Sequence, residues 1–251
     1  MIFLVAALYS TVGHAGASGY LACMALIGLV PEVMRPAALI LNILVATIGT
    51  VRFARAGYFS WRIFLPFAIA SVPCAYFGGR SKLPAEIYHF VLGIVLLFAA
   101  FQLFRKAVAF QSMPTKPPAP FVSILVGAGL GFLSGLTGVG GGIFLSPILL
   151  LMHWANPQTT AGVSAAFILV NSVAGLTGAW KDVNQLPGAI ALWAVAAIVG
   201  GNIGSYLGSR RLTGPAIRRL LAAVLVVAAC DQLIKANRKS GGNDATRTQP
   251  A

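Results

Sequence analysis

Charge is scarce in this chain of 251 residues. Only 9% of the residues are Asp, Glu, Lys or Arg, and only five are acidic, whereas 58% are hydrophobic and the mean hydropathy is +0.85. This composition excludes a disordered chain, a coiled coil and a soluble nucleic-acid module, which all need many more charged residues. The net charge of +13 therefore indicates basic loops that face anionic membrane lipid, and no nucleic-acid partner is expected.

Groups that bind metals, redox cofactors or nucleotides are also missing from the sequence. Cys23, Cys74 and Cys230 lie in apolar runs without a CxxC pattern, which is typical of small packing residues. No cluster of His, Cys and carboxylates predicts a metal or cofactor, and no Gly-x-x-x-x-Gly-Lys-Ser/Thr motif predicts use of a nucleotide. Residues 1–29 lack the basic start of a secretory signal, so we expect them to be membrane structure. We expect no cofactor, no metal and no enzymatic activity.

Long apolar runs make up most of the chain. A bilayer core about 30 Å thick needs about 20 apolar residues for each helical crossing. Charges, prolines and glycines divide the sequence into eight apolar segments, at 2–29, 36–51, 63–79, 87–104, 120–152, 160–180, 186–208 and 216–234. The predicted fold is an all-α polytopic membrane protein with about eight transmembrane segments.

The sequence also repeats itself. Displacing it by about 130 residues aligns 76–80 with 206–210, and Asn42 falls on Asn171. We therefore predict two repeats of four segments each, a pattern typical of secondary transporters. The predicted divisions are a first transmembrane repeat at 1–106, a basic and proline-rich linker at 107–119, a second repeat at 120–236 and a polar, disordered tail at 237–251.

The number of crossings decides how the two repeats are related. With single crossings the repeats are parallel, whereas an extra pass in the long segments 2–29 and 120–152 inverts them. With single crossings, more Lys and Arg lie on the side that holds both termini, which favours cytoplasmic termini. That side would hold Arg52, Arg55, Arg62 and Lys181, and the opposite side Arg35, Arg80, Lys82 and Arg210.

Two glycine-rich stretches interrupt the apolar segments. Because glycine costs about 1 kcal/mol relative to alanine inside a helix, we predict that the first and fifth segments are broken or re-entrant. Unwound backbone in a membrane survives only beside protein or a watery cavity, and a half-helix N-terminus there favours an anion. The candidate substrate-binding glycines are Gly16, Gly19, Gly138, Gly140, Gly141 and Gly142. Close helix packing is the competing role, and we assign it to the series Gly127, Gly131, Gly135 and Gly200, Gly204, Gly208.

Few polar side chains lie inside the apolar segments, and each is a candidate because an unpartnered polar group is expensive in hydrocarbon. Asn42 and Asn171 occupy equivalent positions in the two repeats, either as site residues or as an interhelical hydrogen bond. His14, Ser18 and Thr137 lie in the glycine-rich stretches. An imidazole there could carry protons or bind an anion, although a lone histidine is more often structural.

Two other functions fit part of the pattern. Gly16-Ala17-Ser18-Gly19 has the Gly-x-Ser-Gly form of rhomboid intramembrane proteases, but it lies early in the chain and its repeat copy has no serine. A membrane scaffold without transport activity would need Asn42 and Asn171 only for stability. The repeats and helix breaks favour a transporter over both alternatives.

These features resemble the sulfite exporter TauE/SafE family of membrane transporters. The resemblance rests on Gly-Leu-Thr-Gly-Val-Gly-Gly-Gly-Ile-Phe-Leu-Ser-Pro at 135–147, its degenerate copy at 12–22 and the two-repeat layout. It implies movement of small, often sulfur-containing anions such as sulfite, sulfoacetate or related sulfonates across the bacterial inner membrane, with proton coupling left open. The expected partners are this anion and anionic membrane lipid, and a homodimer is an open oligomeric state.

Overall fold

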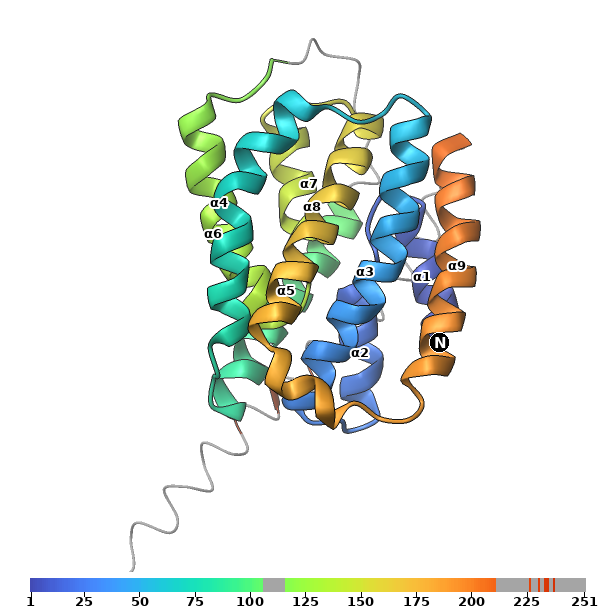
Figure 1. The fold of residues 1–251 in the computed structure, drawn as a ribbon, viewed down its shortest axis with the longest axis vertical. Coiled ribbons are helices and arrows are strands. Elements are labelled where there is room, and N and C mark those ends of the chain that lie inside the picture. The colour runs from blue at the N-terminus through green and yellow to red at the C-terminus, as the bar shows by residue number, and fades with distance from the viewer. Residues whose placement is uncertain (106–115, 211–225, 227–229, 231–232, 235–236, 238–251) are drawn as a thin grey trace, which may run out of the picture.

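The computed structural model describes residues 1–105 and 116–210, together with residues 226, 230, 233, 234 and 237. Those residues form helices and connecting loops, without a strand (Figure 1). The helices are α1 (Ile2–Ser10), α2 (Ala17–Leu26), α3 (Pro31–Arg55), α4 (Trp61–Arg80), α5 (Ala85–Arg105), α6 (Pro120–Thr137), α7 (Gly142–Leu151), α8 (Pro157–Gly178), the 3-10 helix η1 (Trp180–Gln185) and α9 (Ile190–Arg210). Most of the predicted linker, the final apolar segment at 216–234 and the tail lie outside the described residues.

Five of these helices are long and apolar enough to cross a membrane, namely α3, α4, α6, α8 and α9. Each has at least 18 residues, which at about 1.5 Å per residue approaches the thickness of a bilayer core. The predicted segments 36–51, 63–79, 160–180 and 186–208 fall on four of them, and α5 covers the predicted segment 87–104. The chain is therefore a multi-pass helical membrane protein, as predicted.

The two longest predicted segments are each divided into two helices. Segment 2–29 forms α1 and α2, and segment 120–152 forms α6 and α7. The amide nitrogen of Lys116, before α6, donates to the carbonyl oxygen of His153, after α7, at 3.0 Å. Both ends of the second segment therefore lie at the same end of the bundle, so α6 and α7 form a re-entrant hairpin, one of the two predicted forms.

Because α7 returns to this end, the predicted sides of Arg210 and Lys181 are wrong. Arg52, expected opposite Arg210, lines the same surface groove as Ser209, the residue before Arg210. Arg35, expected opposite Lys181, forms an ion pair with Asp182, the residue after Lys181. The prediction assumed single crossings, whereas α7 returns toward the end at which α6 begins, and this reverses the direction of the helices that follow.

Glycine stripes press two pairs of helices together. In α6, Gly127, Gly131 and Gly135 form a stripe that faces the backbone of Phe67, Ser71 and Ala75 in α4. In α9, the stripe Gly200, Gly204 and Gly208 faces the backbone of Phe3 and Ala7 in α1 and of Thr11 directly after it. A Cβ atom at any of these glycines would overlap a backbone carbonyl oxygen of the neighbouring helix. The predicted packing role of both stripes is confirmed. In both pairs residue numbers rise together, so α4 runs parallel to α6, and α1 to α9.

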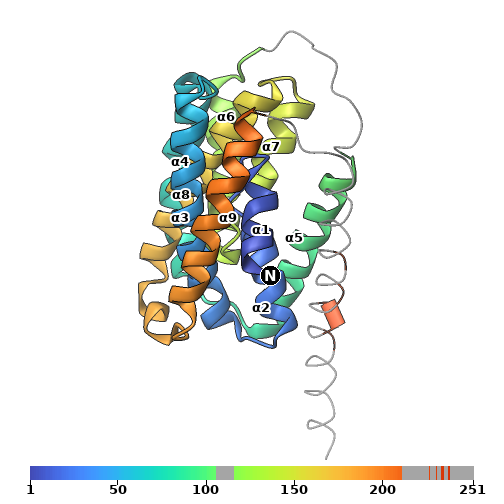
Figure 2. The same ribbon diagram turned by 90° about the vertical axis from the view of Figure 1, so that its right-hand side faces the viewer.

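Helices α3 and α8 lie between these two pairs (Figure 1). Gly49 of α3 faces Ala165 of α8, whereas Leu39 of α3 faces Gly175 near the other end of α8, so the two helices are antiparallel. Figure 2 shows α5 at the edge of the bundle opposite α3 and α4. The buried core contains α2, α3, α8 and the inner faces of α1 and α7, and both glycine-rich breaks lie there.

Candidate functional site

The two breaks meet inside the bundle. A small cavity lies between them, lined by Tyr9, His14, Ala15, Gly16, Ala17, Ser18, Val139, Ile143 and Ile168. Its volume is about 10 Å³, which is about the space of one water molecule. Residues more than 120 positions apart in the sequence therefore line one cavity. In this conformation the cavity has no room for a larger ligand.

Two half-helix N-termini flank this cavity. Gly16 precedes α2 with φ of 103°, and Gly141 precedes α7 with φ of 76°; this left-handed conformation favours glycine. The first backbone N–H groups of any helix have no intrahelical partner, and in α2 and α7 no side-chain cap at the N-cap position accepts from them either. Both N-termini carry a partial positive charge, and together they favour an anion between them.

His14 connects the first break to the second half of the chain. Its Nε2 lies 2.8 Å from Ser146 Oγ and 3.2 Å from the carbonyl oxygen of Gly142. Ser146 Oγ in turn lies 2.8 Å from Ser164 Oγ on α8. All three side chains are buried, and they form a continuous hydrogen-bonded chain from the break to α8. Such a chain can orient a polar ligand or pass a proton between its members.

Ser18 is the second residue of α2 and is also buried. Its hydroxyl donates to the Tyr9 hydroxyl of α1 at 3.2 Å, so it joins the two arms of the first hairpin. Gly19 packs against Val5 and Tyr9 rather than lining the cavity. In this conformation Ser18 contributes to the cavity wall, and Gly19 contributes to the packing of α2 on α1.

The two asparagines are fully buried but have different surroundings. Asn42 Nδ2 donates to Ser172 Oγ at 3.4 Å, and a Cβ atom on Gly140 would lie 2.7 Å from the same nitrogen. Asn171 Nδ2 instead donates to the carbonyl oxygen of Phe167 in its own helix at 2.8 Å. Neither Oδ1 has a hydrogen-bond partner among the described residues. The structure thus brings Asn42 to the second break, and both amides keep a buried acceptor oxygen unused.

The remaining predicted residues form the second break itself. Thr137 Oγ1 donates to the carbonyl oxygen of Leu133 at 2.8 Å and accepts the Val139 amide at 3.4 Å, closing the end of α6. Gly138 packs on Arg35, and Gly142 packs on Ile168 of α8. Thr137, Gly138, Gly140, Gly141 and Gly142 are all buried.

A buried ion cluster beside this break was not predicted from the sequence. Arg35 Nη2 lies 3.0 Å from Asp182 Oδ2, and Nη1 donates to the carbonyl oxygen of Ser81 at 2.9 Å. The exposed Lys82 lies 3.1 Å from the other oxygen of Asp182. The cluster joins the start of α3 to the loop after α4 and to η1. The predicted segments 2–29 and 36–51 leave Arg35 in a loop. The sequence signal that could have identified the cluster is the scarcity of acids, which makes each of the five acidic residues a candidate partner.

The described residues contain no group of three His, Cys, Asp or Glu side chains arranged to hold a metal ion. The polar atoms of the site are backbone amides, hydroxyls, carboxamides and one imidazole. Groups of this kind are able to bind an oxyanion by hydrogen bonds and dipoles.

Comparison with known proteins agrees with this description. The family model for the sulfite exporter TauE/SafE matches residues 1–231. The probable membrane transporter protein y4hK of Sinorhizobium fredii is 42% identical over 229 residues, covering 90% of this chain and 92% of that protein. The probable membrane transporter protein YjnA of Bacillus subtilis is 25% identical over 245 residues, covering 90% and 95%. No solved structure matches the chain. The chain therefore belongs to the sulfite exporter TauE/SafE family of membrane transporters.

Proposed function

We propose that this protein is a secondary carrier or facilitator for a small anion, with sulfite and organosulfonates as the substrate class. The observation that carries the proposal is that two uncapped half-helix N-termini, those of α2 and α7, flank one buried cavity. Two converging helix dipoles favour a compact oxyanion without needing a buried cationic side chain at the cavity.

Side chains around the cavity complete the proposed site. Asn42 would donate its amide hydrogens toward an anion held at Gly140, because its Nδ2 already faces that glycine. The chain of His14, Ser146 and Ser164 would supply a second contact and, if transport is coupled to protons, the route for a proton. Asn171 would take the place of Asn42 when the anion is held at the first glycine-rich break instead.

Transport requires the breaks to separate, because the cavity has room for only about one water molecule. We propose that the two halves are inverted repeats, since their equivalent helices α3 and α8 run antiparallel. An inverted pair has two related conformations of similar energy, one open to each side of the membrane. The ion cluster of Arg35 and Asp182 would close one end of the pathway.

The distribution of charge supports an orientation in the inner membrane. Arg52, Arg55, Arg62 and Lys116 lie at the end where α3 finishes and α6 begins. The opposite end, where α3 and α5 begin and α8 finishes, holds Arg35, Arg80, Lys82 and Lys181, but the acids among the described residues, Glu32, Glu86 and Asp182, also lie there and offset most of this charge. We propose that the basic end faces the cytoplasm, because Lys and Arg are enriched in cytoplasmic loops.

Flux measurements in proteoliposomes test this function. We expect the full chain to carry sulfite or an organosulfonate faster than protein-free vesicles, and sulfate provides a second oxyanion for comparison. Repeating the assay with and without a proton gradient tests the coupling. The Ser18→Ala variant should keep most of the flux. Absence of flux for all these anions, or proteolysis that disappears with Ser18→Ala, would contradict the carrier proposal.

A further inference from the structure

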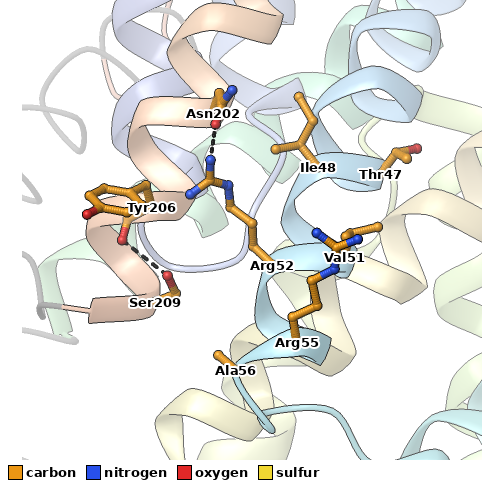
Figure 3. A pocket seen from close by; sticks show the side chains of 9 residues that line it. All are labelled: Thr47, Ile48, Val51, Arg52, Arg55, Ala56, Asn202, Tyr206 and Ser209. Carbon is orange, nitrogen blue, oxygen red and sulfur yellow. Dashed lines mark hydrogen bonds between the residues drawn. The ribbon is translucent and has the colours of Figure 1, made fainter.

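A groove on the outer surface lies between α3 and α9 (Figure 3), and none of its lining residues lines the buried cavity. It has a volume of about 620 Å³, which is within the usual range of small-molecule sites. Its lining residues are Thr47, Ile48, Val51, Arg52, Arg55 and Ala56 from α3, and Asn202, Tyr206 and Ser209 from α9. The groove therefore bridges the two halves of the chain near the basic end of the bundle.

Two guanidinium groups occupy this groove. Arg52 donates to Asn202 Oδ1, and its guanidinium carbon lies 5.3 Å from the centroid of the Tyr206 ring (Figure 3). Both contacts fix the position of the guanidinium while leaving other N–H groups available. Arg55 lies one turn further along α3, is exposed, and has no hydrogen bond or ion pair to any residue that the structure describes. Among the residues that the structure describes, the groove thus holds one positive charge with a fixed position and one without a partner.

No acid among the described residues neutralises these charges. Glu32 and Asp182 lie at the other end of α3 and of α8, so the nearest described carboxylates are separated from the groove by most of the bundle. A charged ligand that occupies this groove would therefore be an anion with at least two acceptor oxygens, matching the donor fork of an arginine.

Apolar side chains beside the arginines narrow the choice of anion. Ile48 and Val51 of α3 line the groove, and Val51 is 42% exposed. Both belong to a helix that is long enough to cross the membrane, so the exposed part of this wall faces hydrocarbon. A free inorganic anion would gain nothing from this wall, whereas a phospholipid would lay an acyl chain along it.

We propose that the groove between α3 and α9 binds an anionic phospholipid, with the phosphate between Arg52 and Arg55 and an acyl chain along Ile48 and Val51. Clusters of Lys and Arg at the cytoplasmic membrane surface attract such lipids. Because α3 and α9 belong to different halves, the bound lipid would hold the halves together at this end. This site is separate from the proposed anion-transport site and does not depend on it.

Lipid titration of the purified full chain in neutral detergent tests the proposal, with bound lipid counted by native mass spectrometry. We expect saturable binding of phosphatidylglycerol and much weaker binding of phosphatidylcholine. The double variant Arg52→Gln/Arg55→Gln should weaken phosphatidylglycerol binding about 30-fold, since each basic residue contributes about 1 kcal/mol near an anionic surface. Arg52→Lys keeps the charge but loses the donor fork, so its effect should be smaller.

Arg62→Gln is the matched control. Arg62 is an exposed arginine of α4 at the same end of the bundle, but it does not line the groove. Equal loss of lipid in Arg62→Gln and in the double variant would overturn the proposal in favour of general surface charge. Full competition by inorganic phosphate or sulfite at equal concentration would assign the groove to a soluble anion. Unchanged binding in the double variant would also overturn it. These outcomes measure binding, so they are independent of whether the chain transports sulfite.

Discussion

Removing the carboxylate of Asp182 should destabilise the protein more than removing its partner Arg35. Both side chains are buried, with 4% and 7% of their surface exposed, so the loss of one partner leaves the other charge in a poorly solvated place. Breaking such a pair costs about 3–5 kcal/mol. The two losses are not equal, however. In Arg35→Met, the carboxylate keeps Lys82, whose side chain is 68% exposed and can adjust. In Asp182→Ala, the Ser81 carbonyl is the one partner that the guanidinium keeps among the described residues.

Equilibrium unfolding in mixed micelles measures these differences. We expect a loss of about 3–5 kcal/mol for Asp182→Ala and a smaller loss for Arg35→Met. The double variant Arg35→Met/Asp182→Leu should recover most of the stability, since replacing a buried ion pair with apolar side chains is often neutral. Lys82→Ala is the control and should change stability by less than about 1 kcal/mol, because its charge is largely solvated.

Two results would refute this reasoning. If Asp182→Ala unfolds at the same denaturant concentration as the unchanged protein, Arg35 does not depend on that carboxylate. If the double variant is no more stable than Asp182→Ala, the loss comes from packing rather than from an unpaired charge. Flux provides an independent test: if the cluster closes the pathway, the folded double variant should leak anions at a higher rate.

Further predictions concern the second break and the polar chain. Gly140→Ala should lower sulfite flux several-fold, because φ of +84° strains an alanine by about 1–2 kcal/mol and its Cβ would lie 2.7 Å from Asn42 Nδ2. Gly129→Ala is the matched control in α6, where no atom lies within 4 Å of the added carbon, and it should leave flux unchanged. Equal flux in Gly140→Ala and Gly129→Ala would show that transport does not depend on the geometry of the second break. Ser146→Ala should change the pH dependence of flux while the protein stays folded, since it removes a partner of His14 at 2.8 Å; an identical pH profile would exclude this chain from proton transfer.

Sequence patterns predicted those features of the fold that depend on neighbouring residues. Helix length, the breaks before Ala17 and Gly142 and the two glycine stripes follow from local hydropathy, from glycine content and from spacing of four residues. The number of crossings depends on whether a break turns the chain back, and local glycine content does not encode that direction. For this reason Lys181 and Arg210 were assigned to the wrong ends.

The sequence identified many residues of the candidate site but not how those residues are arranged. Repeat matching identified Asn42 and Asn171, but only packing shows that Asn42 faces Gly140 while Asn171 bonds within its own helix. Arg35 and Asp182 are 147 residues apart, and no local pattern relates them. Ser146 lies in an apolar run that reads as part of an ordinary helix, and its role follows only from its distance to His14.

The glycine stripes also determine which parts of the molecule can move as rigid units. Each stripe joins one helix of the first half to one of the second, α4 to α6 and α1 to α9, with the two backbones in contact. A hinge between the sequence halves would pull both contacts apart at several points at once. Opening the central cavity should instead keep α4 with α6 and α1 with α9, so that two composite arms, each drawn from both halves, swing about the antiparallel pair α3 and α8. We therefore expect the molecule to open along a boundary that differs from the division between the two halves of the sequence.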